Sequence, residues 1–484
     1  MKKKLISLLL SLIVILSFSI SSIYADTNNK GKVIYLSLNR TSLENLLEIP
    51  IIKEKTSNSG YVALMTTKGD GSNTDQKSFA SIGSGVRANV LDEDYVKFET
   101  LNENEKTQFE AATGVKSWAI GNIKINRNIN QNTDNGGYGA TLGMLGTTLN
   151  KNNLKVALLG NSDIKKNDDL KKIRNLALVC MDENGRVQSG NVDNINKKDD
   201  TMPFGISTDY DKLKSETKKY HENNDAIFVE LGDTYRLDEY KNNLNENTYK
   251  SMKKKIYQNI NDYLKEVFEM AGKNDTIYIV SEFESNLDYK TKRRLSPVIK
   301  FEKDGYGLLE SSTTRNSGIV SNIDIGVDII NKFGLKNELM IGKVFKNVQD
   351  ENGIKKVLKD YERIVSINTI RASVVNSYVG IVSASWVIAM IAILFKNKIP
   401  KKEKGLGRDQ IFKVLKELIK LGLIMPLAFL TAPVFQFKTP AGLVSGVLIV
   451  TIIYYEYAYT HIYVLNGQSQ KDVSLTIWDR WFPR

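Results

Sequence analysis

Short hydrophobic runs, bounded by polar residues or glycine, recur along roughly the first two thirds of the chain. A run that lacks alternating polar positions is typical of a β-strand covered on both faces. We therefore expect buried strands at residues 33–38, 61–65, 155–159, 176–181, 226–231 and 276–281.

The spacing of apolar residues changes between the last two of these runs. Hydrophobic side chains recur there at helical intervals, and Gly272 then supplies a stop. They are Ile256, Ile260, Tyr263, Leu264, Val267 and Phe268. Strands separated by helices predict an α/β fold, with a mainly parallel, twisted sheet sandwiched by helices.

The N-terminus has the pattern of a signal peptide. Lysines at 2–4 precede an apolar run over 5–20, and small residues follow up to Ala25, after which we expect cleavage. The alternative is an uncleaved anchor helix. Either arrangement places the segment that follows outside the cytoplasm.

Three long apolar segments near the C-terminus predict a membrane domain. We expect spans at 373–395, 418–435 and 441–464, and the first is long enough to cross a hydrocarbon layer of ~30 Å. Lysines and an arginine cluster between 396 and 408, so we expect that loop to be cytoplasmic. The tail over 465–484 ends abruptly, as in a shortened version of a longer polytopic protein.

A stalk is expected between the globular domain and the first span. Ile354, Val357, Leu358 and Tyr361 recur at three- and four-residue spacing, which predicts an amphipathic helix. The expected organisation is a signal peptide at 1–25, an extracytoplasmic domain at 26–345, a stalk at 346–372, a membrane domain at 373–464 and a tail at 465–484. We therefore expect a multi-pass protein of the cell membrane.

The net charge and the cysteine content limit the partners and the disulfides that we expect. The net charge of +12 could suggest nucleic acid, but the basic residues are spread over polar faces and beside apolar segments. We therefore expect the lipid bilayer as a partner and no nucleic acid. Cys180 is the only cysteine, so no intramolecular disulfide can form, and its apolar neighbours predict a buried strand thiol.

Polar residues directly after the predicted strands are the first candidates for a site, because ligands of parallel sheets bind beyond the strand ends. Asn39 and Arg40 follow the first strand, Asp233 follows the strand ending at 231, and Glu282 follows the strand ending at 281. Thr74 precedes a small-residue helix. Its hydroxyl could be a nucleophile, although an ordinary N-cap is the commoner role.

In this order the segments resemble the alkaline-phosphatase superfamily, in particular the membrane-anchored alkaline-phosphatase-like proteins of Gram-positive bacteria. No single motif is specific, and the resemblance lies in the ordered series over about 32–335. The matching segments are 33–40, 74–85, 142–161, 230–236, 295–298, 311–320 and 322–330.

The resemblance implies a hydroxyl nucleophile beside two divalent metals. Carried over by position, Thr74 would be the nucleophile, and Asn39, Asp233 and Glu282 would be remnants of the metal ligands. Any bound anion would be held by two arginines and backbone amides. The two arginines are Arg236 and Arg315.

The departures from the family pattern weigh against a standard metal centre. Asn39 stands where an aspartate is expected, Phe283 stands in place of a histidine, and His221 is the only histidine of the domain. We therefore expect no standard two-zinc site. The acidic residues, Asp75 among them, could still hold one Mg²⁺, Mn²⁺ or Ca²⁺.

Three functions are compatible with these residues. The first is a non-catalytic binding or structural module at the cell envelope, with a phosphorylated envelope molecule as its ligand. The second is a hydrolase or transferase of phosphate or sulfate esters that uses a non-standard oxygen-ligand metal site. The third is lipid handling or transport by the membrane helices, for which Glu456 and His461 are the candidates.

Overall fold

The computed structural model describes residues 31–91, 96–166, 169–303, 305–401, 407–431 and 439–465. The predicted signal peptide and residues 466–484 of the tail lie outside this part. The chain divides into two compact units, residues 1–357 and 358–484, and each is described by itself.

The first unit is built on a sheet of eleven described strands. Its order is β18-β15-β16-β17-β2-β14-β13-β1-β12-β5-β9. One half of the sheet contains β13 (Thr276–Val280), β1 (Val33–Ser37), β12 (Ala226–Leu231), β5 (Val156–Asn161) and, at its edge, β9 (Ser189–Asn191). The remaining strands are β2 (Gly60–Thr66), β14 (Leu295–Phe301), β15 (Gly307–Ser311), β16 (Asn316–Ser317), β17 (Ile319–Ser321) and β18 (Lys346–Gln349).

Most strand pairs in the centre are parallel, which confirms the predicted fold class. Strand β1 pairs in parallel with both β12 and β13, and β12 pairs in parallel with β5. Strand β14 runs antiparallel between β13 and β2. All five residues of β1 are buried, as expected of a strand that is covered on both faces.

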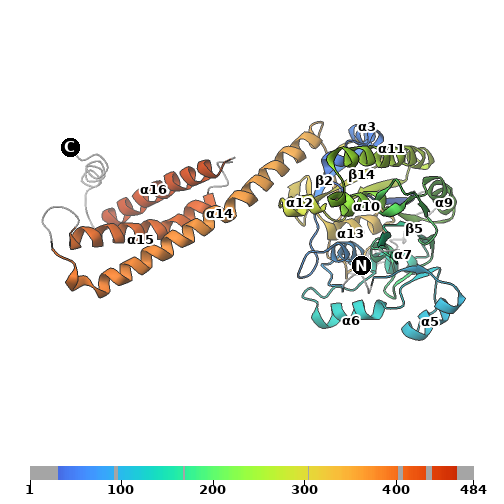
Figure 1. Cartoon of the computed structure of the whole chain (residues 1–484), viewed down its shortest axis with the longest axis horizontal. Helices are drawn as coiled ribbons and strands as arrows, with labels where there is room; N and C mark the ends of the chain where they lie inside the picture. The colour runs from blue at the N-terminus through green and yellow to red at the C-terminus, as the bar shows by residue number, and fades with distance from the viewer. Residues whose placement is uncertain are drawn as a thin grey trace, which may run out of the picture. The chain divides into compact units, whose positions relative to one another are not determined.

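Helices cover both faces of the sheet (Figure 1). One layer contains α3 (Pro50–Ser59), α9 (Tyr210–Asn223) and α11 (Glu246–Met270). The other contains α4 (Asp75–Ser84), α7 (Met144–Lys151), α8 (Ala177–Cys180) and α13 (Asn322–Lys332). Helix α11 confirms the helix predicted from the spacing around Ile256.

The smaller elements of this unit surround the strand ends and one side of the domain. The helices are α2 (Leu43–Leu46), α5 (Glu103–Thr113), α6 (Ile125–Asn135), α10 (Asp233–Tyr240) and α12 (Asn286–Lys290). A small sheet contains β3 (Glu99–Thr100), β4 (Ile120–Gly121) and β8 (Arg186–Val187). Two hairpins pair β6 (Ile164–Lys166) with β7 (Asp169–Lys171) and β10 (Asn196–Lys198) with β11 (Ile206–Thr208).

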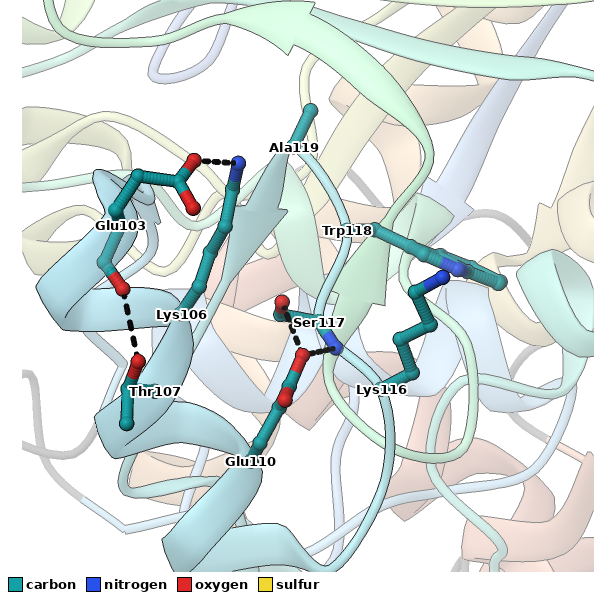
Figure 2. Close-up of a pocket in the computed structure, with 8 residues that line it drawn as sticks. All are labelled: Glu103, Lys106, Thr107, Glu110, Lys116, Ser117, Trp118 and Ala119. Atoms are coloured by element: carbon teal, nitrogen blue, oxygen red, sulfur yellow. Dashed lines mark hydrogen bonds and ion pairs between the residues drawn. The ribbon is translucent and has the colours of Figure 1, made fainter.

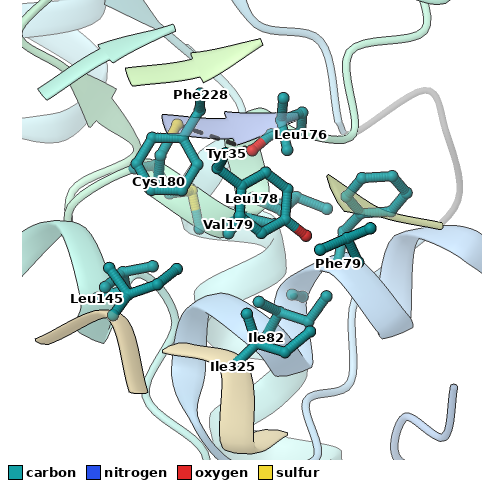
Figure 3. Close-up of a cluster of buried hydrophobic side chains, with 14 of the residues drawn as sticks. Tyr35, Phe79, Ile82, Leu145, Leu176, Leu178, Val179, Cys180, Phe228 and Ile325 are labelled. Atoms are coloured by element: carbon teal, nitrogen blue, oxygen red, sulfur yellow. Dashed lines mark hydrogen bonds between the residues drawn. The ribbon is translucent and has the colours of Figure 1, made fainter. Parts of the chain in front are cut away.

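The main hydrophobic core lies between the sheet and the α4, α7, α8 and α13 layer (Figure 3). The rings of Tyr35 and Phe228, from adjacent strands, are 5.3 Å apart between centroids. Phe79 and Ile325 reach the same cluster from α4 and α13. These buried side chains hold the layer against the sheet.

The predicted strand over 176–181 is wrong, because Ala177–Cys180 forms the short helix α8. A continuous apolar run fits a buried helical turn as well as a buried strand. Glycines on two neighbouring helices make room for it: an added Cβ on Gly83 would lie 2.3 Å from the Leu178 carbonyl oxygen, and one on Gly146 would lie 2.3 Å from that of Cys180. The thiol is buried as expected, and burial raises the pKa of Cys180.

The second unit consists of long helices. Its elements are α14 (Gly353–Leu394), which begins in the first unit, α15 (Arg408–Thr431) and α16 (Pro440–Leu465). The helix predicted over the stalk is present as the first part of α14. In the described residues, α14 and the segment 441–458 of α16 are long and apolar enough to cross a membrane.

The described residues therefore contain two candidate spans, fewer than the three predicted. The predicted span 418–435 overlaps α15, which does not meet the same criterion of length and composition. Lys416, Glu417 and Lys420 lie within this helix. Placing three charged side chains in the hydrocarbon layer costs free energy. Residues 432–435 of the predicted span lie outside the described part of the chain.

Candidate functional site

The carboxyl edge of the central strands carries the candidate site. Strands β1, β12 and β13 run in parallel register, with Ser37 beside Glu230 and Val280. The residues that follow each strand therefore emerge at the same edge of the sheet. Helix α4 begins at that edge, because Asn39 contacts its first residue, Asp75.

Arg40 is the centre of this edge. Its Nε and Nη2 atoms donate to the two carboxylate oxygens of Asp75, at 3.0 and 2.5 Å. Its Nη1 atom donates to Asn286 Oδ1 at 3.0 Å. The carboxylates of Asp238 and Glu239 lie 3.5 and 3.8 Å from the same guanidinium. One cation therefore faces three carboxylates.

Aromatic rings enclose the same guanidinium. Its central carbon lies 5.5 Å from the ring centroid of Tyr235 and 5.4 Å from that of Phe283. Only 10% of the Arg40 side chain is exposed. Burial alone would lower the pKa of Arg40, but Asp75 outweighs it and the pKa lies above its ordinary value. Burial also raises the pKa of Asp238 to about 6.

Asn39 is fixed by both ends of its amide. Its Nδ2 atom donates to Asp75 Oδ1 at 2.9 Å, and its Oδ1 atom accepts from the backbone N–H of Phe283 at 2.9 Å. The side chain is buried. Asn39 therefore connects the ends of β1 and β13 to the start of α4.

Thr74 is the N-cap of α4. Its hydroxyl oxygen accepts from the backbone N–H of Lys77 at 3.4 Å, and its backbone is extended, as is usual for a cap. This position is the one expected from the sequence. A role as a nucleophile remains a prediction.

Glu282 points into the core. Its two carboxyl oxygens accept from Tyr35 Oη at 2.9 Å and from Ser37 Oγ at 2.8 Å, and the residue is fully buried. Burial raises its pKa to about 8. Its oxygens are therefore used by hydroxyl groups of β1, while the Arg40 cluster uses other carboxylates.

Asp233 and Arg236 bind one another inside the domain. Asp233 Oδ1 accepts from Arg236 Nε at 3.0 Å and Nη2 at 2.8 Å. The remaining donors of Arg236 are directed to Thr208 Oγ1 and to the carbonyl oxygens of Asn161 and Asp163. Arg236 is fully buried and keeps no donor for a ligand in this arrangement. Arg315 is exposed, at a turn where its φ is 58°.

The structure thus brings together only part of the predicted set. Asn39 and the residue after Thr74 are in contact, whereas Asp233 and Glu282 use their carboxylates in separate networks. Sequence reasoning missed the central role of Arg40 and its contacts with Asp238 and Glu239. The available sequence signal was a basic residue directly after the first strand.

These residues do not fit the two-metal centre that the resemblance implies. The Arg40 guanidinium occupies the space between the carboxylates of the edge, and Phe283 supplies a ring instead of an imidazole. Among the residues that the structure describes, no three His, Cys, Asp or Glu side chains form a group able to hold a metal ion. A metal would have to displace a buried arginine.

No family model matches the sequence, and no curated protein matches it. Solved structures resemble the fold. Lipoteichoic acid synthase LtaP from Listeria monocytogenes is 11% identical, with a TM-score of 0.35 over 65% of this chain and 74% of that one. An alkaline-phosphatase superfamily protein from Vibrio parahaemolyticus is 11% identical, with a TM-score of 0.39 over 65% and 69%.

Alkaline phosphatase from the Antarctic bacterium TAB5 is also similar, at 12% identity and a TM-score of 0.34, over 63% of this chain and 99% of that one. Likenesses of this size do not say what the chain binds or cleaves.

Proposed function

We propose that the first unit is a non-catalytic binding or structural module at the cell envelope, held there by the membrane helices. Its fold is of the alkaline-phosphatase type, and an arginine supplies the positive charge where active members hold metal ions. The observation that carries this proposal is the set of contacts between Arg40 and the carboxylates of Asp75, Asp238 and Glu239.

Charge balance supports this interpretation. Removing one partner of a buried ion pair leaves an uncompensated charge, which costs about 3 to 5 kcal/mol. A divalent metal bound to the same carboxylates would leave the Arg40 guanidinium as a buried charge without a partner. Arginine also cannot lose its proton to relieve the repulsion. The cluster therefore favours its own cation over a metal.

The surroundings of the Thr74 hydroxyl give further support. A hydroxyl nucleophile needs a metal or a general base nearby to be activated. The Thr74 hydroxyl caps α4, and its helix neighbour Asp75 is neutralised by Arg40. Glu282 faces the core hydroxyls of Tyr35 and Ser37. The Thr74 hydroxyl oxygen is thus engaged by a backbone N–H, and no described hydrogen bond joins it to a general base.

The test uses the full chain in mild detergent. Hydrolysis of a generic phosphomonoester, phosphodiester and aryl sulfate is measured with Mn²⁺, Zn²⁺ or Mg²⁺ and with a chelator. We expect no metal-dependent turnover, no stoichiometric metal by elemental analysis, and the same melting temperature with and without metal.

The control for trace contamination is Thr74→Ser, which preserves both the cap and a hydroxyl, compared with Thr74→Ala. Metal-dependent hydrolysis that the serine variant retains and the alanine variant loses would overturn the proposal. It would favour the hydrolase or transferase instead, with Thr74 as its nucleophile.

A further inference from the structure

A groove of about 530 Å³ lies between α5 and the segment that follows it, and it shares no residue with the carboxyl-edge site (Figure 2). Its volume is within the ~300–1,000 Å³ that small-molecule sites commonly have. Trp118 is the only aromatic residue that lines it. In sequence, Trp118 is also the only tryptophan before residue 386.

The Trp118 ring is held in place by a fixed cation. The Arg186 guanidinium lies 3.9 Å from the ring centroid. Arg186 is itself bound through Nε and Nη2 to Asp182 Oδ2, at 3.0 and 2.7 Å, and it donates to the backbone carbonyl of Lys116. The ring therefore has little freedom to turn, while its residue remains partly exposed at the groove.

Helix α5, the other wall of the groove, is hydrogen-bonded to the segment that carries Trp118. The backbone N–H and the hydroxyl of Ser117 both donate to Glu110 Oε1, at 3.0 and 2.7 Å. These bonds are the main reason that the pKa of Glu110 lies below its ordinary value. Beyond Trp118 the chain continues into β4, which pairs with β3 and β8. The groove is thus formed before any ligand arrives, which reduces the cost of binding.

The charges of the groove are balanced. Glu103 and Lys106 form an ion pair at 2.6 Å, and Glu110 and Lys116 supply one further charge of each sign (Figure 2). Without net positive charge, the groove has no general attraction for a polyanion. With a single aromatic ring among polar groups, it also offers little to a purely apolar ligand.

We propose that this groove binds a neutral saccharide. One face of a sugar ring carries C–H groups that can stack on Trp118, and its edge carries hydroxyls that both donate and accept hydrogen bonds. Glu103 and Glu110 supply acceptors, and Lys106 and Lys116 supply donors. The proposal extends the binding role suggested for the first unit, but it concerns a different surface and a different measurement.

The test measures the tryptophan emission and binding heat of the full chain in detergent, with maltotriose and N,N′,N″-triacetylchitotriose as probes. We expect at least one probe to bind and to change the emission. Trp118→Ala should weaken binding about tenfold or more, equivalent to ~1.4 kcal/mol, and Trp118→Phe should weaken it less. Trp386→Phe is the matched control and should leave binding unchanged.

A second variant separates a loss of sugar binding from a loss of folding. Glu110→Gln keeps an acceptor for Ser117 but removes the charge, and it should weaken sugar binding about fivefold with the melting temperature preserved. Binding should also be the same at about 0.05 and 0.5 M salt, because the ligand is neutral.

Failure of both probes to bind at about 10 mM would refute the proposal. The same holds for binding that Trp118→Ala leaves intact, or for salt-sensitive binding of a polyanion alone. None of these results would alter the assignment of Arg40, because that assignment is tested by metal content and hydrolysis.

Discussion

Glu282 is a buried carboxyl group whose partners are hydroxyls instead of a cation. The pKa of Glu282 is raised to about 8, mainly by burial, against an ordinary value near 4.5. For a raised pKa, the stabilising contribution is fully present below the unfolded value and is lost as the pH rises through the folded value. We therefore expect the melting temperature to fall as the pH rises from about 4.5 to about 8, and to level off above that.

Glu282→Gln should remove most of this pH dependence above pH 7, because an amide has no proton to lose there. The effect on the free energy of unfolding at pH 8 is on the order of a few kcal/mol. Below pH 7 a smaller slope should remain, since burial also raises the pKa of Glu230 to about 7. Scanning calorimetry from pH 5 to 9 measures both.

The exposed Glu269→Gln is the control and should reproduce the wild-type profile. A Glu282→Gln profile that runs parallel to the wild type at every pH would contradict the argument. It would mean that the carboxyl group of Glu282 is not neutral in the folded protein.

At the scale of elements, the close contact of α4 with α8 depends on Gly83. A Cβ at this position would lie 2.3 Å from the Leu178 carbonyl oxygen and 2.7 Å from that of Val179. Alanine favours a helix over glycine by about 1 kcal/mol, but overpacking against backbone costs about 1 to 3 kcal/mol. We expect Gly83→Ala to destabilise the first unit by up to about 2 kcal/mol.

Gly272→Ala is the comparison, because its added Cβ would lie at ordinary contact distance from Asp275. It should change the melting temperature very little. Equal melting temperatures for the two variants would show that α4 and α8 can separate without cost.

Comparing helix α8 with the central strands shows where sequence reasoning failed and where it succeeded. Strands such as β1 and β12 were predictable because their apolar runs are long enough to be covered on both faces and are bounded by polar residues. The run at 176–181 has the same composition, but it lies against Gly83 of α4 and Gly146 of α7, which are far away in sequence and leave room for a helical turn. Composition within one segment cannot contain that information.

The residues of the candidate site likewise divide into those whose position follows from local sequence and those whose partners are distant in sequence. Asn39 and Thr74 were placed correctly, because a strand end and a helix cap are local features. The partners of Glu282 and Arg236 come from distant segments, Tyr35 for the one and Thr208 for the other. Their buried roles therefore became visible only with the tertiary fold.

For the whole molecule, we predict that the first unit lies outside the cytoplasm and that the basic loop at 396–413 lies inside. Two helices are apolar and long enough to span a membrane, and the loop's lysines favour the cytoplasmic side. External protease added to intact cells should digest the first unit. A cytoplasmic marker protein must stay intact in the same sample.

Protection of the first unit in intact cells, with digestion after the cells are opened, would reverse this topology. Such a result would also remove the envelope setting from the proposed function. The sugar-binding groove would remain testable in the purified protein.

The Arg40 cluster limits how this edge of the sheet could change during evolution. A lineage that acquired a metal centre at this edge would need new ligands near Asn39 and Phe283 and would also have to lose Arg40. Each step taken alone leaves buried charges without a partner, at a cost of several kcal/mol against a total stability of ~5–15 kcal/mol. The intermediate forms would fold poorly, so a metal centre is hard to acquire at this edge by single substitutions.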